Sequence, residues 1–294
     1  MQEKIHVKGL NGLRAIAAIC VVLSHVALPG IKLPYILFLA SLAQYGVTLF
    51  FTLSGFLITF LLFKEKTVTG INIKKFYIRR ILRIWPLYFA YLIIVIIIAV
   101  ITDQGKNPEL LPWYLFFAAN VPAFLHIYIP FLSHYWTLGV EEQFYIFWPW
   151  IIKKSGRVLK ALIIFTVCFF ALKLFFRFIY FHWGNITPLF VIQLNRFECM
   201  SMGGIAALLC LRGHRLFLKI ATHPVTDIIC WLCLGIMAVN KFYITPLIDH
   251  DIAALVTIGL IVNQGFSKRP VLNLENRFFD LAGKLSYGDR KSVV

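Results

Sequence analysis

From Ser41 to Phe63 the chain reads SLAQYGVTLFFTLSGFLITFLLF, and no charged side chain interrupts it. An apolar run of this length crosses the hydrocarbon layer of a bilayer as a helix, because a helix satisfies its own backbone hydrogen bonds. Similar runs recur between Leu10 and Phe266. The whole chain of 294 residues is 60% hydrophobic and only 14% charged. This composition is typical of a membrane protein and not of a soluble domain.

Basic residues fall between the apolar runs, and their placement predicts how the chain crosses the membrane. Lys4 and Lys8 put the N-terminus in the cytoplasm. The segment from Lys64 to Arg83 is the strongest cytoplasmic marker, because Glu65 is its only acidic residue. Orientation in a membrane thereby explains the net charge of +16, and we expect no binding to nucleic acid.

The prediction is an all-α fold, a polytopic transmembrane helix bundle that forms a single domain over residues 1–294. The lipid bilayer is then its first partner. We expect the stretch 102–133, which contains Pro108, Pro112 and Pro122, to be an outer loop with a half-inserted or interfacial segment. The bundle has about eight expected spans, at residues 10–28, 41–63, 84–101, 135–152, 162–178, 197–211, 225–243 and 252–266.

The six cysteines lie in or beside apolar runs, where a disulfide framework has little purpose. Cys230 and Cys233 have the C-x-x-C spacing, but no second Cys or His pair accompanies them. We therefore predict neither a metal site nor a tightly bound cofactor. Most other histidines, His250 among them, are expected to be solvated in loops or at interfaces.

Arg14 and His25 stand eleven positions apart in the first apolar run. At about 100° per residue they return to within roughly 20° of one helix face, about 16 Å apart along the axis. An ionisable side chain at lipid depth is costly unless it faces a partner or a wet cavity, so both are candidate catalytic residues. The alternative for His25 is a hydrogen bond between helices.

Arg79, Arg80 and Arg83 stand where the basic segment turns into the third expected span. Arg79 and Arg80 each lie about one helical turn from Arg83, so a pair of guanidinium groups could clamp a phosphate. The alternative is ordinary anchoring by positive charge at the cytoplasmic face, which needs no ligand.

The run that begins after His134 carries two adjacent carboxylates, Glu141 and Glu142. Glu141 could orient His25, as a carboxylate orients a general base. It could also bind a sugar hydroxyl, or stabilise the N-terminus of its own helix. It shares one helix face with the aromatic residues that follow it, Phe144, Tyr145 and Trp148.

In these segments the chain resembles the acyltransferase-3 family of membrane proteins, which O-acetylate lipopolysaccharide, peptidoglycan and other sugar acceptors. The resemblance runs from about Gly9 to Gly288. The matching motifs, in chain order, are GLNGLRAIAA at 9–18 with SH at 24–25, GVTLFFTLSGFLI at 46–58, FYIRRILRIWP at 76–86, WTLGVEEQFY at 136–145, and RFE at 196–198 with GG at 203–204.

The resemblance implies an enzyme of the bacterial cytoplasmic (inner) membrane. It takes an acyl group, usually from acetyl-CoA, on the cytoplasmic side and passes it to a hydroxyl of a cell-surface polysaccharide or glycolipid outside. The family's motifs imply catalytic roles for Arg14 and His25, and contacts to the coenzyme A phosphates for Arg80 and Arg83. In the fourth motif the family pattern favours the first glutamate, Glu141.

After Gly288 the chain reads DRKSVV, and no apolar span follows. We therefore expect a truncated chain that lacks the family's final helices. Two other functions stay open: a transporter of glycolipids or acyl groups, which also needs charges in an intramembrane cavity, and a non-catalytic membrane partner.

Overall fold

Every regular element of this computed structural model is a helix, within the residues that it describes. Those residues are 7–25, 33–102, 108–124, 127–129, 131–184, 195–245 and 247–286, without the side chains at 25, 33–37, 39, 40 and 284–286. The predicted all-α fold class is therefore confirmed. The elements are α1 (Leu10–His25), α2 (Leu33–Val68), α3 (Ile73–Ile101), η1 (Pro108–Leu110), α4 (Leu111–Leu115), α5 (Asn120–Ala123), α6 (Tyr135–Lys154), α7 (Val158–Trp183), α9 (Phe197–Leu211), α10 (Arg215–Ala221), α11 (Pro224–Ala238), α12 (Asp249–Phe266) and α13 (Arg277–Ser286).

Three helices in the described part of the chain are long and apolar enough to cross a membrane: the Ser41–Val68 part of α2, α3 and α7. A fourth candidate joins α10 and α11, which meet at a bend of 58°. The expected number of about eight spans is not confirmed. α1 and α9 are shorter than the roughly 20 residues that a span needs, and α6 and α12 carry carboxylates in their first halves.

α3 begins earlier than the sequence predicted. Its N-cap is Asn72, whose side-chain oxygen accepts a hydrogen bond from Lys75 N at 2.9 Å. Lysine and arginine are good helix formers, so a basic segment continues a helix as readily as it forms a loop. The three arginines of the basic segment consequently lie within α3 and not at its beginning.

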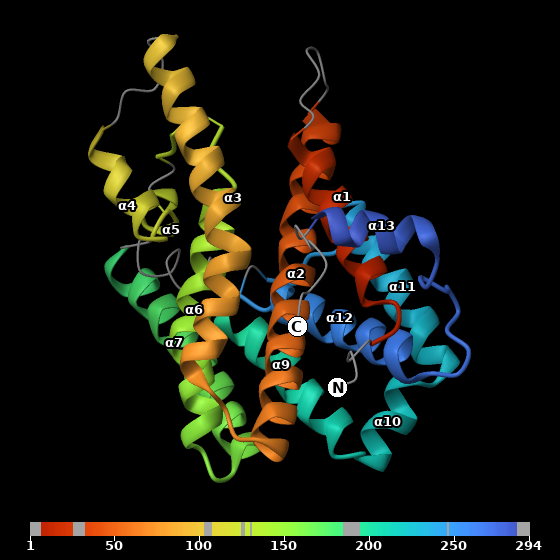
Figure 1. Ribbon diagram of the computed structural model, residues 1–294. Coiled ribbons are helices and arrows are strands. Elements are labelled where there is room, and N and C mark those ends of the chain that lie inside the picture. The colour runs from red at the N-terminus through yellow and green to blue at the C-terminus, as the bar shows by residue number, and fades with distance from the viewer. Residues whose placement is uncertain are drawn as a thin grey trace. The chain divides into compact units, whose positions relative to one another are not determined.

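The described residues form two compact units. Unit 1 takes Met1–Leu61 and Glu198–Val294, and thus combines the two end portions of the chain. Unit 2 is the continuous stretch Leu62–Phe197. Figure 1 shows the helices of unit 1 in red, orange, teal and blue tones, and those of unit 2 from orange to green.

Unit 1 contains two helices that touch through glycine. A Cβ atom on Gly55 of α2 would overlap the backbone of Met200 in α9, and one on Gly203 of α9 would overlap Thr52 O. The two backbones are thus in direct contact, which small residues permit between membrane helices. Beside this pair, α12 is buried along most of its length, and α13 packs along α1 (Figure 1).

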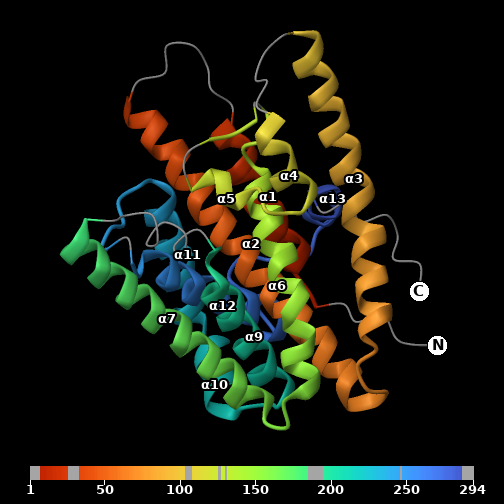
Figure 2. The same ribbon diagram turned by 90° about the vertical axis from the view of Figure 1, so that its left-hand side faces the viewer.

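An aromatic core holds unit 2 together. The Tyr88 hydroxyl of α3 donates to Tyr114 O, and the Tyr135 hydroxyl of α6 donates to Tyr88 O, both at 2.7 Å. Burial raises the pKa of the Tyr114 phenol, which accepts a hydrogen bond from Ile129 N at 3.2 Å. Figure 2 shows α4 and α5 gathered near the start of α6. The stretch expected as an outer loop is therefore folded onto α3 and α6.

Candidate active site

Arg14 lies half-buried on α1, in unit 1. Its Nη1 donates a hydrogen bond to Asn11 Oδ1, one turn earlier, at 3.2 Å. α1 ends at His25, so a single helix carries both candidate catalytic positions, as their spacing predicts. The His25 side chain lies outside the described residues, and the shared catalytic role of the two residues stays a prediction.

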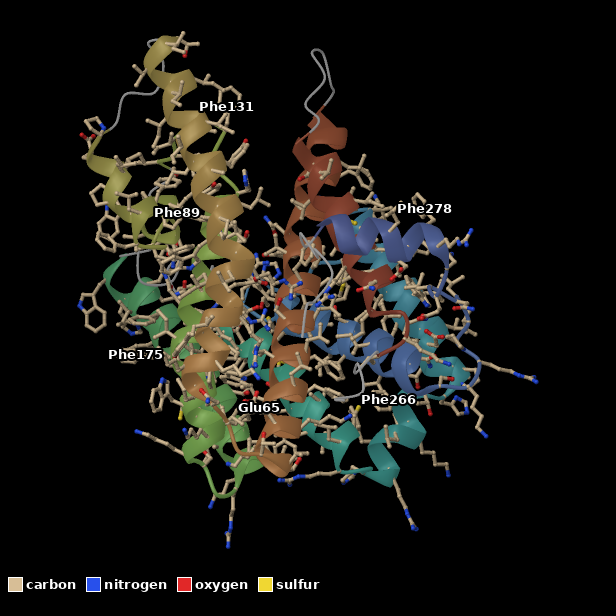
Figure 3. The ribbon with its side chains drawn as sticks, viewed as in Figure 1. Glu65, Phe89, Phe131, Phe175, Phe266 and Phe278 are labelled. Atoms are coloured by element: carbon tan, nitrogen blue, oxygen red, sulfur yellow. The ribbon has the colours of Figure 1, made fainter. Side chains whose placement is uncertain are left out.

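The three arginines of α3 have different surroundings in unit 2. Arg79 is exposed, and its Nη2 forms an ion pair with Glu65 Oε2 at 3.1 Å. Figure 3 shows Glu65 near the end of α2. Arg80 and Arg83 are half-buried, and the Arg80 guanidinium carbon lies 5.0 Å from the centroid of the Tyr145 ring. The ion pair of Arg79 thus joins α3 to the end of α2 across the turn between them.

The two glutamates of α6 also differ. Glu141 is only 7% exposed. The Glu142 carboxylate interacts with the Trp85 indole and lies near the Arg80 guanidinium. Its Oε1 is buried and accepts no hydrogen bond from the residues that the structure describes. A buried acceptor of this kind is costly, so a donor on a ligand would be favourable there. Glu142 thus shares the surroundings of Arg80, although the family pattern favours Glu141.

A cluster of side-chain amides follows these glutamates, and the sequence did not predict it. Gln143 Nε2 donates to Asn120 Oδ1 at 2.8 Å and to Phe117 O at 3.1 Å. Asn120 Nδ2 donates to Gln143 Oε1 at 3.2 Å and to Asn195 Oδ1 at 3.0 Å. The cluster joins α5, α6 and the segment before α9. The signal available in the sequence was Gln143 itself, a polar residue directly after the two glutamates of the fourth motif.

Lys173 is a second residue that the sequence analysis missed. It lies in the second half of α7, in unit 2, and its side chain is only 2% exposed. A lysine at lipid depth is costly unless it has a partner or a functional role. The detectable signal was a charge inside an otherwise apolar run, with Arg177 one turn further along.

A second polar cluster lies in unit 1. His250 lies in the first turn of α12 and is half-buried, and its Nδ1 is 3.2 Å from Thr48 Oγ1 of α2. The expectation of a solvated His250 is therefore not confirmed. Beside it, Glu198, Cys199 and Asp251 have donor atoms within 4.8 Å of one another, a spacing that could hold a metal ion. The Cys199 thiol donates to Glu198 Oε1 at 3.7 Å, so these two groups interact without an ion.

Two cavities of about 220 Å³ each lie in unit 1. The first, here called the polar cavity because most of the side chains around it are polar, opens where the start of α1 meets α13. Its side-chain lining comes from Asn11, Leu274, Glu275, Asn276, Arg277 and Asp280. The second is apolar and is formed by α1, α2 and α11. The polar cavity lies one helical turn from Arg14, since Asn11 lines it.

A family model described as an acyltransferase domain matches residues 7–288 of the chain. No solved structure matches the chain. A Staphylococcus aureus (strain COL) protein named "Putative O-acetyltransferase SACOL0978" is 30% identical over 227 residues, which cover 69% of this chain and 35% of that protein.

Two further relatives carry similar names. The peptidoglycan O-acetyltransferase OatA of Listeria monocytogenes is 32% identical over 162 residues, which cover 49% of this chain and 24% of that protein. The O-acetyltransferase OatA of Staphylococcus aureus (strain NCTC 8325 / PS 47) is 28% identical over 230 residues, which cover 70% of this chain and 35% of that protein. The chain thus spans about a third of the length of these staphylococcal relatives.

Proposed function

Because the chain belongs to the acyltransferase-3 family, whose model matches residues 7–288, we propose that it transfers an acyl group from acyl-CoA to a hydroxyl of a cell-surface carbohydrate. The proposed acyl group is acetyl, since the relatives are named O-acetyltransferases. The proposed acceptor is an envelope polysaccharide, in line with the name of the Listeria protein. The extent of the family match is the observation that carries the proposal.

In the proposed reaction, the acceptor hydroxyl oxygen attacks the thioester carbon. A carbon–oxygen bond forms, the carbon–sulfur bond breaks, and coenzyme A leaves through its sulfur. His25 accepts the hydroxyl proton and returns it to the leaving sulfur, so the proton balance closes. Arg14 compensates the negative charge that develops on the carbonyl oxygen.

Arg80 and Arg83 hold the coenzyme A phosphates in this proposal. They lie about one turn apart on α3, and both are half-buried, which strengthens their attraction for an anion. Arg79 belongs to the same predicted set, but a phosphate would compete there with Glu65. Because Arg79 is exposed whereas Arg80 and Arg83 are half-buried, we expect Arg80 and Arg83 to contribute more to donor affinity than Arg79.

Glu141 acts in this proposal from α6, either by orienting His25 or by binding the acceptor hydroxyl. The protein works in the bacterial cytoplasmic membrane with its N-terminus inside, so that it meets acyl-CoA in the cytoplasm and its acceptor outside. The basic segments between the apolar helices support this orientation.

Acetyl-CoA turnover by membranes that contain the chain tests the proposal, with soluble peptidoglycan fragments as the acceptor. We expect wild type to release the coenzyme A thiol and to acetylate the fragments. His25→Ala and Arg14→Ala should each lower turnover by about 100-fold or more at equal insertion, because each removes a group that acts in the transition state. His182→Ala is the matched control, because that histidine is exposed at the end of α7.

Turnover that survives His25→Ala would remove the proposed base. If wild type leaves the thioester intact, but the same membranes carry a fluorescent glycolipid across in a gradient-dependent manner, the protein is a transporter and the proposal is wrong.

A further inference from the structure

Asn11 lies between a candidate catalytic residue and a carboxylate from a distant part of the chain. Its Oδ1 accepts from Arg14 Nη1 at 3.2 Å. Its Nδ2 donates to Asp280 Oδ1 at 2.7 Å. One end of the amide can only accept and the other can only donate, so the two hydrogen bonds fix which way the amide faces. A rotated amide would oppose donor to donor at Arg14 and acceptor to acceptor at Asp280.

The helix that carries Asp280 is held closely against α1. A Cβ atom on Gly283 would overlap the backbone of Asn11, and one on Gly12 would lie 2.5 Å from Leu274 Cβ. Gly9 N donates to Glu275 Oε2 at 2.6 Å, which satisfies a backbone donor at the start of α1. Figure 1 shows α13 beside α1 in unit 1. Contacts before Asp280 in the chain, at Leu274 and Glu275, and after it, at Gly283, therefore hold Asp280 opposite Asn11.

We propose that Asp280 is a positioning residue, which acts through Asn11 to hold the Arg14 guanidinium in its working orientation. This inference rests on the proposed function, in which Arg14 acts on the donor. The negative charge of Asp280 polarises the Asn11 amide and so strengthens the acceptor that Arg14 uses. α13 then belongs to the catalytic apparatus, although no family motif used for the assignment of roles includes it.

The polar cavity beside these residues makes the inference testable by substitution. Asn11 and Asp280 both line it, and both are half-buried. Water can therefore reach the pair, and breaking the pair costs less than it would in a closed core. We expect variants at these two positions to fold and insert.

A reciprocal pair of variants provides the test. Asn11→Asp places two carboxylates at hydrogen-bond distance, so the Asp280 contact breaks. The new carboxylate still accepts from Arg14, but Asp280 no longer holds it in place, and the guanidinium group shifts with it. We expect kcat for acetyl transfer to fall about tenfold while KM for acetyl-CoA changes less than about twofold, because small displacements of a reacting group act mainly on the rate. Adding Asp280→Asn restores a donor opposite the new carboxylate, and kcat should return to within about threefold of wild type.

The matched control is Asn276→Asp, which makes the same chemical change on the same cavity. Asn276 is exposed, and its Oδ1 accepts from Phe279 N at 2.9 Å, a role that a carboxylate also fills. If Arg14→Ala abolishes turnover but Asn11→Asp is as active as wild type, or the double variant is no better than Asn11→Asp, the positioning role is wrong and the proposed function stands. If Arg14→Ala is fully active, the role proposed for Arg14 itself is wrong.

Discussion

Lys66 illustrates how a single charge can serve a purpose beyond orientation in the membrane. It stands in the basic segment that marks the cytoplasmic side, yet its Nζ donates to Ile152 O at 2.6 Å, Lys153 O at 3.2 Å and Ser155 O at 2.6 Å. The last carbonyl groups of a helix have no partner within it, and a cation there is favourable. The end of α2 therefore caps the end of α6 within unit 2.

Replacing Lys66 by methionine keeps most of the side-chain volume and removes these hydrogen bonds. We expect a loss of about 1 kcal/mol, since the site is partly open to solvent and such bonds are weakened there. Thermal unfolding in detergent measures it as a lower Tm. Lys75→Met is the control, because Lys75 is an exposed lysine of the same basic segment. Equal Tm values for the two variants would mean that the cap contributes nothing.

Among the elements, α2 and α9 pack closely because each has a glycine, without a side chain, at their contact. Gly55 and Gly203 lie in these two helices, and each faces the backbone of the other one. The sequence contained both glycines within family motifs, but it could not say that they face each other. That relation arises only when helices far apart in the chain pack together.

Alanine at either glycine should force α2 and α9 apart. We expect a loss of about 3 kcal/mol or more for Gly55→Ala and for Gly203→Ala, because the added methyl group meets backbone that cannot rotate away. Gly235→Ala in α11 is the control, since a Cβ atom there meets nothing within 4 Å, and alanine favours a helix. Size-exclusion profiles and Tm in detergent separate the outcomes. If Gly55→Ala behaves as Gly235→Ala does, the close contact is wrong.

The positions of most helices were predictable from hydropathy, because apolar runs and basic segments mark them directly. The beginning of α3 was not, since Lys and Arg favour helix and loop alike. Within the candidate site, the sequence indicated Arg14 by its charge inside an apolar run, and Arg80 and Arg83 by their spacing and their family motif. It could not predict the role of Asn11, because that role depends on the hydrogen-bond partner of the side chain. The partner, Asp280, lies on α13, far away in the sequence.

For the molecule as a whole, the alternation of basic and apolar segments predicts which ends of the helices face the cytoplasm. The turn between α6 and α7 is basic, with Lys153, Lys154, Arg157 and Lys160 around it. The segment after α11 holds Tyr243, whose side chain is 74% exposed. The rule that positive loops stay inside assigns the first to the cytoplasm and the second to the outside.

Labelling of intact cells with a membrane-impermeant maleimide tests this orientation. We expect Tyr243→Cys to react in intact cells, and Gly156→Cys to react only after permeabilisation, because a charged reagent does not cross the bilayer. The chain with its native cysteines alone gives the background. Reaction of Gly156→Cys in intact cells would reverse the orientation, and acyl-CoA would then need another route to its site.

The make-up of unit 1 has a consequence for how the protein is made. Gly9 and Glu275 share a hydrogen bond although they stand 266 positions apart. At a synthesis rate of about 5–20 residues per second, α1 waits roughly 10–50 s in the membrane before the residues that hold it have left the ribosome. Unit 2 is continuous and can complete its own contacts during that interval. During that time α13 does not yet cover the polar face of α1 that carries Asn11 and Arg14. We therefore expect α1 to depend more than the other helices on the insertion machinery or on membrane chaperones until translation ends.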